Sequence, residues 1–399
     1  MADNKDKKVL NVPHLRFPEF SGEWDYSTIG SEFDLYSGNT PSRLDKEQFN
    51  GDVNWISSGE LKEHYIYDTK EKITEEAASY NNLRLLPIGT FVIAIYGLEA
   101  EGVRGTGSII KKKSTISQAC MAFSSKGAII NEFLYSWYKK HGNLIGLKYA
   151  QGTKQQNLSY DIISQFRISY PSIKEQKKLE EFISLLDERI ATQNKIIEKL
   201  ESLIKGIYDK VLWQGYKQTS LSEILVERNE RTTINNQYQV LSSTAKGLYR
   251  QSDYFEKEVA SINNIGYKVL RLGDIVLSPQ NLWLGNINYN DAFEIGIVSP
   301  SYKVFSIRED YNPYFVSCFL KTPKALYEYA NASEQGASVV RRNLDVNAFM
   351  AICFPMPNRI MQNIISERLR AMNMKLDTEK QIFEKLNIQK QYLLRQMFI

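Results

Sequence analysis

The sequence has few of the residues that build metal sites and disulfide frameworks. It contains three cysteines, Cys120, Cys318 and Cys353, which lie far apart without a CxxC pair, and three isolated histidines. This pattern argues against a zinc site or a disulfide-bonded secreted domain, and it suits a reducing cytosol. We therefore predict no metal ligands in this chain and a cytoplasmic location.

Long apolar runs are also missing. No stretch approaches the roughly 18 residues that a membrane-spanning helix needs, and residues 1–8 are polar and charged, unlike a secretory signal. The 399 residues, 43% of them hydrophobic, predict a soluble protein of more than one domain that does not enter a membrane. The formal net charge of +4 is compatible with DNA binding but does not by itself indicate it.

Motifs for catalysis and nucleotide binding are incomplete. No Gly-Lys pair is present, which excludes a Walker A loop. Residues 312–315, Asn-Pro-Tyr-Phe, lack the second proline of the Asn-Pro-Pro-aromatic loop of adenine methyltransferases, and we interpret Asn312 as a helix N-cap. The glycines of residues 102–107 precede strand-like residues instead of the helix that a dinucleotide fingerprint requires. A metal-dependent nuclease cluster would consist of Asp52, Glu60 and Lys62, a spacing that is common by chance. The chain is therefore predicted to bind rather than to catalyse.

A heptad pattern organises residues 171–215. Its apolar residues recur at alternating steps of three and four, the spacing of a coiled-coil helix. Ser172 followed by Glu175 predicts a capping box at the start, and Gly215 follows the last periodic turn. The roughly 40 residues from Lys174 to Trp213 would form a rod of about 60 Å, which needs a partner. The periodic positions are Leu179, Ile183, Leu186, Ile190, Gln193, Ile197, Leu200, Ile204, Ile207 and Val211.

The partner is a second copy of this pattern in the same chain. Residues 198–200, Glu-Lys-Leu, recur at 384–386, an offset of 384 − 198 = 186. Residues 86–92 match 270–276, Asn157 and Pro171 match Asn343 and Pro357, and all follow in the same order. This colinear order predicts a tandem duplication of a globular domain plus a long helix. The second seam consists of Ile365, Leu369, Met372, Leu376, Glu379, Phe383, Leu386 and Leu393.

Both globular segments are predicted to be mixed α and β. Short runs rich in β-branched and aromatic residues indicate strands at 91–96, 103–110, 119–124 and 166–170, then at 269–278, 302–307 and 352–356, and a helix at 130–141. The predicted organisation is a tail at 1–21, a first domain at 22–170, a long helix at 171–215, a second domain at 216–357 and a second long helix at 358–399.

Several motifs in this order resemble a known family. They are residues 15–20, Leu-Arg-Phe-Pro-Glu-Phe, followed by Trp24; residues 37–42, Ser-Gly-Asn-Thr-Pro-Ser; and residues 171–176, Pro-Ser-Ile-Lys-Glu-Gln. With the duplicated order of domain and helix, essentially the full chain is similar to the DNA specificity subunit of Type I restriction-modification systems. One departure is Met361, which stands where the first helix has Glu175. We therefore expect the second helix to begin less sharply.

The resemblance implies a non-catalytic function. It implies two similar α+β target recognition domains, each reading one half of a bipartite double-stranded DNA sequence. The paired helices would space these domains and carry two methyltransferase subunits, with restriction and translocase subunits as further partners. It implies no cofactor in this chain, and S-adenosylmethionine, ATP and Mg²⁺ on the partner subunits. A coiled-coil scaffold that binds proteins without reading DNA remains the alternative.

Candidate DNA contacts follow from the chemistry of base reading. Bases are read in the major groove by Arg, Asn or Gln, while Lys and Arg hold phosphates. Two loops at matching positions of the repeat carry these residue types, and one of Arg341 and Arg342 is expected to read guanine. The plainer alternatives are solvated loops, an exposed hairpin tip for residues 111–113, and a turn before a proline for residues 37–40. The candidates are Ser37, Asn39, Thr40, Ser58, Lys111, Lys112, Lys113, Lys154, Gln155, Gln156, Asn157, Gln280, Asn281, Arg341, Arg342 and Asn343.

An antiparallel arrangement of the two helices is predicted from chain length. The second domain would have a radius of gyration of about 14 Å when compact. A parallel pair would force it to carry the chain back along a rod of about 60 Å, whereas an antiparallel pair lets the chain enter and leave at one end. The polar heptad positions Gln193 and Glu379 are expected near the centre of the seam, where polar residues lower stability while fixing register.

Overall fold

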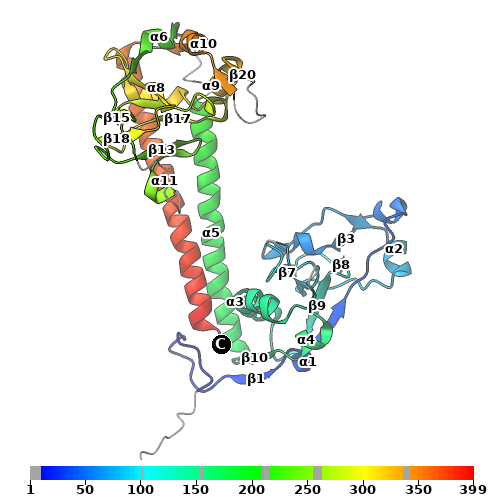
Figure 1. Cartoon of the computed structure of the whole chain (residues 1–399). Coiled ribbons are helices and arrows are strands. Elements are labelled where there is room, and N and C mark those ends of the chain that lie inside the picture. The colour runs from blue at the N-terminus through cyan, green and yellow to red at the C-terminus, as the bar shows by residue number, and fades with distance from the viewer. Residues whose placement is uncertain are drawn as a thin grey trace, which may run out of the picture. The chain divides into compact units, whose positions relative to one another are not determined.

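The computed structural model describes residues 10–100, 102–152, 156–208, 210, 215–254, 263–335 and 342–399. The chain forms two compact units: unit 1 is Met1–Asn194 with Gln381–Ile399, and unit 2 is Lys195–Lys380. The two long helices, α5 (Ile173–Ile207) and α11 (Arg359–Met397), each contribute residues to both units (Figure 1).

Unit 1 is built on a five-stranded sheet in the order β2-β9-β6-β7-β4. A three-stranded sheet, β5-β3-β8, and an antiparallel pair, β1-β10, complete its strands. The strands are β1 (Asp25–Thr28), β2 (Phe33–Ser37), β3 (Val53–Ile56), β4 (Tyr65–Ile66), β5 (Lys72–Ile73), β6 (Phe91–Ala94), β7 (Gly107–Ile110), β8 (Ser114–Ile116), β9 (Cys120–Ser125) and β10 (Arg167–Tyr170). The shorter helices are α1 (Ile29–Glu32), η1 (Lys46–Phe49), η2 (Ser58–Glu60), α2 (Glu75–Tyr80), α3 (Asn131–Tyr149) and α4 (Tyr160–Ser164).

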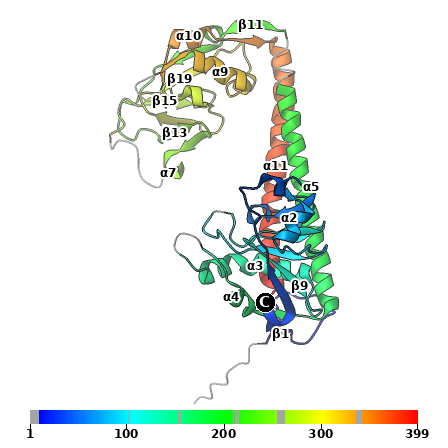
Figure 2. The same ribbon diagram turned by 90° about the vertical axis from the view of Figure 1, so that its right-hand side faces the viewer.

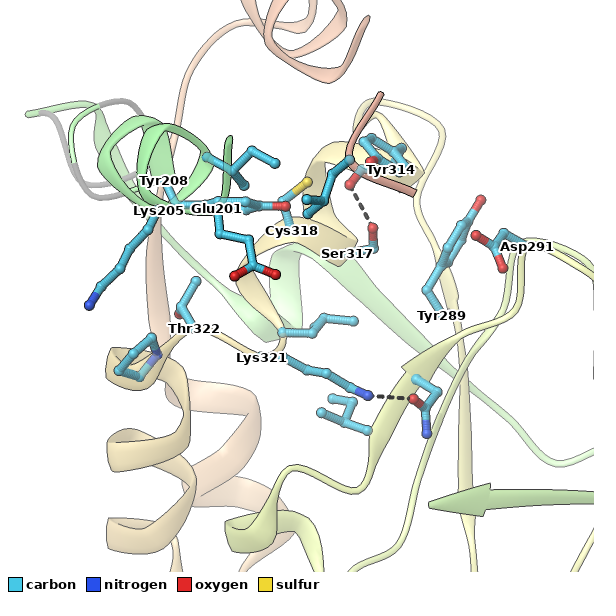
Figure 3. A pocket seen from close by; sticks show the side chains of 16 residues that line it. Glu201, Lys205, Tyr208, Tyr289, Asp291, Tyr314, Ser317, Cys318, Lys321 and Thr322 are labelled. Atoms are coloured by element: carbon cyan, nitrogen blue, oxygen red, sulfur yellow. Dashed lines mark hydrogen bonds between the residues drawn. The ribbon is translucent and has the colours of Figure 1, made fainter. Parts of the chain in front are cut away.

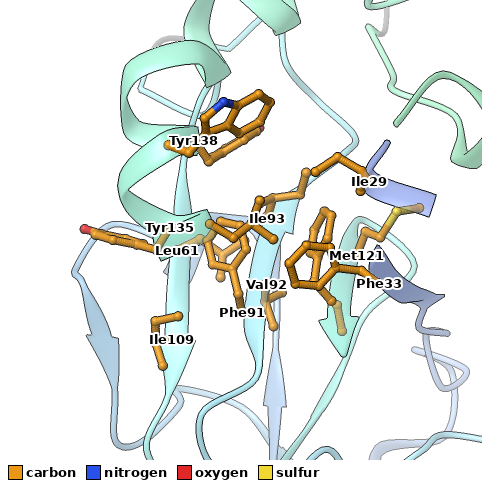
Figure 4. Close-up of a cluster of buried hydrophobic side chains, with 14 of the residues drawn as sticks. Ile29, Phe33, Leu61, Phe91, Val92, Ile93, Ile109, Met121, Tyr135 and Tyr138 are labelled. Atoms are coloured by element: carbon orange, nitrogen blue, oxygen red, sulfur yellow. The ribbon is translucent and has the colours of Figure 1, made fainter. Parts of the chain in front are cut away.

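The core of unit 1 lies between the five-stranded sheet and α3. Strand β6 is buried along its whole length because it is central in the sheet and covered by α3. The ring of Phe91 meets the rings of Tyr135 and Tyr138 at centroid distances of 6.0 and 5.8 Å (Figure 4). A short, continuously apolar strand is the pattern expected of a strand covered on both faces.

Unit 2 is built on a four-stranded sheet in the order β12-β19-β16-β17, with four further strand pairs, β11-β22, β13-β14, β15-β18 and β20-β21. The strands are β11 (Lys217–Ser220), β12 (Leu225–Arg228), β13 (Leu241–Thr244), β14 (Gly247–Arg250), β15 (Lys268–Arg271), β16 (Ile275–Leu277), β17 (Ile287–Tyr289), β18 (Ile295–Val298), β19 (Lys303–Ile307), β20 (Ser333–Gln335), β21 (Arg342–Leu344) and β22 (Cys353–Met356). The shorter helices are α6 (Leu221–Ile224), α7 (Gln251–Tyr254), η4 (Leu282–Leu284), α8 (Pro313–Phe319), α9 (Pro323–Asn331) and α10 (Val346–Ala351).

The sheet order shows the duplication. The order β12-β19-β16-β17 in unit 2 repeats β2-β9-β6-β7 in unit 1, and the pair β11-β22 repeats β1-β10. The predicted fold class, two similar mixed domains in tandem with a long helix after each, is confirmed. One predicted strand was wrong: residues 269–278 form two strands, β15 and β16, in different sheets. The chain turns between them because Gly273 has φ +87° and the Asp274 carboxylate accepts the N–H of Arg271 at 2.9 Å.

A stretch of α5 lies alongside a stretch of α11 in each unit (Figures 1 and 2). In unit 1, Asp187 forms an ion pair with Lys390, while Ile183, one turn earlier on α5, and Met397, further along α11, are buried in the same core cluster. In unit 2, Glu201 pairs with Lys380 at 2.7 Å, and Tyr208, directly after the end of α5, bonds Asn373, earlier on α11. Because one helix advances as the other retreats, the pairing is antiparallel in both units, as predicted.

The heptad positions of both helices point inward. In the described residues each is buried or half-buried, and the polar positions Gln193 and Glu379 are only 9% and 7% exposed. Glu379 forms an ion pair with Lys375 one turn away, at 2.5 Å. Counting along the antiparallel helices from the Asp187–Lys390 ion pair places Gln193 opposite the turn near Glu384 in unit 1. The Glu201–Lys380 ion pair places Glu379 beside Glu201 in unit 2. Val211 lies outside the described residues.

The helix starts differ from the prediction. The Ser172 hydroxyl accepts the N–H of Glu175 at 3.4 Å, but the Glu175 carboxylate binds Arg16 of the N-terminal tail at 2.7 and 2.8 Å, so the reciprocal half of the capping box is missing. The second helix was expected to begin less sharply, and this was wrong. Asn358 supplies the cap, because its side-chain oxygen accepts the N–H of Met361 at 2.9 Å.

The three cysteines differ in their surroundings. Cys120 and Cys318 are buried, and loss of solvent raises the pKa of their thiols to about 12 and about 11, while Cys353 is exposed. None of the helices within the described ranges combines the length and the apolar character needed to cross a membrane.

Antiparallel pairing predicts a specific cross-link. Asp187→Cys together with Lys390→Cys should be joined by a short bismaleimide, because the native side chains form an ion pair in unit 1. The measurement is the change in gel mobility under denaturing conditions, in a chain that also carries Cys353→Ser. Asp187→Cys with Lys385→Cys is the matched control, since Lys385 is exposed on the same helix. Cross-linking of the control in place of the test pair would contradict the observed register.

Candidate nucleic-acid interface

Two loops of unit 1 are joined to each other, and the second of them carries predicted DNA contacts. They are residues 95–106, after β6, and residues 151–158, before α4. The N–H of Leu98 donates to the carbonyl of Gln156 at 3.1 Å, and Arg104 donates to the Gln156 side chain at 3.0 Å. The N–H of Gln156 donates to the Glu99 carboxylate at 2.7 Å, which lowers the pKa of Glu99. Gln156 is therefore used to hold the loops together, and Lys154 and Gln155 lie outside the described residues.

Asn157 closes the second of these loops. Its N–H and C=O pair with the main chain of Gln151 at 2.9 and 2.8 Å, and Gly152 between them has φ +108°, a conformation suited to glycine. The side-chain oxygen of Asn157 is buried and has no hydrogen-bond partner within the part of the chain that the structure describes. Among the four predicted contacts of this loop, Asn157 thus keeps hydrogen-bonding capacity that the fold does not use.

The predicted contacts Ser37, Asn39, Thr40 and Ser58 gather around the connection between β8 and β9. The Ser37 hydroxyl donates to the carbonyls of Gln118 and Cys120, and the N–H of Asn39 donates to Ile116 at 3.3 Å. The Asn39 side chain accepts the N–H of Thr40 at 2.8 Å, so it shapes its own loop. Ser58 is half-buried in η2, directly after β3.

The same connection ties these residues to the first loop pair. The N–H of Ile95 donates to Ala119 and the N–H of Leu158 donates to Ile95, both at 2.9 Å. Gly38 sits where the chain crosses β8, and a Cβ there would lie only 1.7 Å from the carbonyl oxygen of Ile116. The structure therefore brings together the loops of Ser37, Asn39 and Gln156, with glycine required at the crossing.

The three lysines at 111–113 do not form a hairpin tip, so that interpretation was wrong. They connect β7 and β8, which belong to different sheets and do not pair. Lys111 lies 3.9 Å from the Glu132 carboxylate and 4.0 Å from the ring centre of Tyr65, and Lys112 lies 3.8 Å from Asp68. Lys112 and Lys113 are exposed. These lysines thus occupy a separate basic segment with acidic neighbours.

Unit 2 joins the equivalent pair of loops. The N–H of Arg342 in the second loop donates to the carbonyl of Gln280 in the first at 3.2 Å, whereas in unit 1 Leu98 of the first loop donates to Gln156 of the second. The Arg342 guanidinium lies over the ring of Trp283, 4.5 Å from its centre, and donates to the carbonyl of Ala330 at 3.2 Å. Asn343 is exposed on β21 and Asn281 is half-buried before η4. Arg341 lies outside the described residues.

The structure also shows residues that sequence reasoning missed. The match of residues 86–92 with 270–276 is an offset of 184, so Tyr96 corresponds to Gln280 and is likewise exposed. Following the repeat to that position would have identified Tyr96. Trp283 carried no such signal, because its contact with Arg342 joins segments far apart in the sequence.

A cavity of about 600 Å³ opens in unit 2 between the helices and the domain. It is lined by Tyr208, directly after α5, and by Tyr289, Tyr314 and Cys318 of the domain, and Lys321, which also lines it, donates to Asn288 at 2.7 Å (Figure 3). Burial lowers the pKa of Lys321. In the described ranges no three His, Cys, Asp or Glu side chains are grouped to hold a metal ion. The acidic-lysine cluster is not a nuclease site in this fold, since Glu60 accepts the N–H groups of Ser57 and Lys70 with both oxygens.

Comparison with known proteins identifies the loop-bearing domain of unit 1. The sequence model of the Type I restriction modification DNA specificity domain matches residues 21–202. Residues 21–202 belong to this family. The resemblance drawn from the sequence is therefore confirmed for the segment that holds the first recognition domain and the start of α5.

Two proteins with related sequences are specificity subunits, and one solved structure has a similar fold. The MjaIX specificity subunit of Methanocaldococcus jannaschii is 30% identical over 45% of this chain and 42% of its own length, and the EcoR124I/EcoR124II specificity subunit of Escherichia coli is 28% identical over 49% and 48%. The matched region thus spans about half the length of these relatives. The S subunit of the Type-I restriction-modification system from M. genitalium has a similar fold, with a TM-score of 0.59, 17% identity and coverage of 97% of this chain and 99% of that one.

Substitution of Arg342 tests whether this arginine stabilises the fold or reads a base. Arg342→Ala should lower the free energy of unfolding by about 1–3 kcal/mol, because it removes a charged donor and a cation–π contact. Chemical denaturation measures this, with the exposed Arg359→Ala as control. On DNA variants with single-base changes we expect uniform weakening. A loss confined to one base position would show instead that Arg342 reads that base.

Proposed function

We propose that this chain is the non-catalytic sequence-reading subunit of a Type I restriction-modification complex. It reads a bipartite target in double-stranded DNA and positions adenine methyltransferase and restriction subunits on it. The observation that supports this most directly is the joined loop pair of a specificity domain in unit 1, which recurs in unit 2 on the same sheet order. Two copies of one loop pair suit a target with two halves.

The loops have the chemistry that base reading requires. Asn157 in unit 1 and Gln280 in unit 2 belong to the residue types that bond base edges, and Asn343 is exposed on β21 of unit 2. Tyr96 adds an exposed aromatic ring in the first domain, while Lys112 and Lys113 are available to phosphates. Arg342 and Gln156 shape the loops that present these groups. Lys154, Gln155 and Arg341 stay candidates on residue type alone.

A stripe of exposed apolar residues on the outer side of α11, interrupted by Glu367 and Gln381, supports the binding of partner subunits. Ile360 and Met374 in unit 2 are 73% and 65% exposed, and Ile388 and Tyr392 in unit 1 are also exposed. Their spacing follows the heptad, but on the side of the helix away from α5, where a lone pair of helices would carry polar residues. We assign this stripe to the methyltransferase subunits. They would bring S-adenosylmethionine, and the restriction subunits would bring ATP and Mg²⁺, in the cytoplasm.

The function is tested by DNA selection with the complex assembled from this chain and its methyltransferase subunits. A random duplex pool should yield a bipartite sequence, with affinity that falls steeply as salt rises, by a log–log slope of about −0.9 per phosphate contact. The methyltransferase subunits without this chain are the control. If the complex binds without enriching any sequence, the chain is a coiled-coil scaffold, which the same apolar stripe would serve.

A further inference from the structure

A buried glutamine occupies the same place in both units. Gln176 lies in the first turns of α5 and Gln362 in the first turns of α11, at an offset of 362 − 176 = 186, and their side chains are 0% and 2% exposed. A fully buried side-chain amide is costly unless its donors and acceptor are paired. The burial of both therefore requires specific partners.

The partners are equivalent in the two units. Each glutamine donates at 2.8 Å to the carbonyl of the proline before its helix, Pro171 or Pro357. Each also accepts the N–H of the residue that caps a domain helix, Ile130 before α3 at 2.9 Å or Asn312 before α8 at 2.8 Å. In unit 1, Gln176 donates a further bond to Ala128 at 2.9 Å.

These bonds fix each domain to its helix at a second point. The chain itself joins the domain to the helix at the proline, and helix residues such as Leu179 and Leu369 pack in the apolar cores of the two units. The glutamine bonds a different part of the domain, the segment that leads into α3 or α8. Apolar packing is not directional, whereas these fully buried hydrogen bonds restrict the angle between the domain and its helix.

We propose that Gln176 and Gln362 are positioning residues that set the orientation of each recognition domain on its helix, and hence the spacing at which the two half-sites are read. This rests on the proposed function. Gln176→Leu keeps the size of the side chain but leaves the N–H of Ile130 and the carbonyls of Ala128 and Pro171 without a partner. The base-reading loops are elsewhere in the domain, so the half-site sequences should not change.

The experiment is a selection of bound DNA from a pool in which the two half-sites are separated by spacers of varied length. The wild-type complex should prefer one spacer. Gln176→Leu and Gln362→Leu should each reduce that preference about tenfold, because several buried hydrogen bonds are lost, while enriching the same half-site bases. Gln165→Leu, an exposed glutamine of unit 1, is the matched control and should leave the preference unchanged.

Gln176→Asn is a milder substitution with a lower risk of misfolding, because it retains a polar amide. Its side chain is one methylene too short to reach both Pro171 and Ile130. Gln176→Asn should lose less of the spacer preference than Gln176→Leu does. The control Gln165→Leu should have the same melting temperature as the wild type. If a folded Leu or Asn variant selects spacers as narrowly as the wild type does, the positioning role is wrong. If the wild-type complex itself selects no bipartite sequence, it is the proposed function that fails.

Discussion

A chain in which residues 22–170 are replaced by the corresponding domain of a related subunit should recognise a target with one half changed and the other half intact. The domain enters and leaves through β1 and β10, where Asp25 lies directly opposite Tyr170. Both junctions of the exchange therefore lie close together, at the paired strands β1 and β10, which form the stem of the domain. Each mismatched base pair costs about 1–3 kcal/mol, so the original target should fall towards non-specific affinity.

The measurement is DNA selection with the assembled complex, and exchange of residues 216–357 is the reciprocal experiment. In that second chimera Lys217 and Met356 mark an equivalent stem, at the ends of β11 and β22. The two chimeras should alter opposite halves of the target. A change in both halves on a single exchange would refute separate readers.

Gly38→Ala should destabilise the first recognition domain by at least about 4 kcal/mol, at the severe end of single substitutions. The added Cβ would lie 1.7 Å from the carbonyl oxygen of Ile116 and 2.5 Å from its carbonyl carbon. Both are backbone atoms, so relief requires the loop of Asn39 to move away from β8. The same movement would separate this loop from its neighbours at the candidate interface.

Thermal or chemical unfolding of the full chain measures the effect. Gly59→Ala, in the same domain, is the matched control, because no atom lies within 4 Å of its added Cβ and its φ is not in the left-handed region. The control should change stability little. Equal stabilities of the two variants would mean that the Gly38 crossing is looser than the structure shows.

The parts of the fold that sequence predicted are those with local or repeated signals. Positions such as Leu179 and Leu369 mark a helix seam because one periodic pattern fixes both the helix and its buried side. Antiparallel pairing followed from chain length alone, and the duplication followed from colinear matches. These signals require no knowledge of which distant segments meet.

Two of the errors involve contacts between distant segments. Glu175 binds Arg16, 159 residues away, instead of completing its local capping box. Residues 111–113 looked like a hairpin tip, but β7 pairs with β4 and β6, and β8 pairs with β3. Gln362 matched Gln176 in the aligned segments, yet only the structure shows that each bonds the start of a domain helix.

The candidate interface was also predictable from the sequence only in part. Residue type and the repeat located the loop of Gln156 in the first domain and the loops of Gln280 and Arg342 in the second, but not the first-domain loop of Tyr96. Residue type could not show whether a side chain is free to meet DNA. Arg342 is held against Trp283 and Gln156 is held by Arg104, whereas Asn343 on β21 is exposed.

The contrast among the cysteines makes the native chain suitable for single-site fluorescent labelling. The thiolate is the reactive form, and burial with raised pKa suppresses it at Cys120 and Cys318 but not at the exposed Cys353. A maleimide dye should therefore attach to β22, next to the start of α11 in unit 2. With an acceptor dye placed at either end of a target duplex, energy transfer would reveal which half-site the second domain occupies, without any engineered residue.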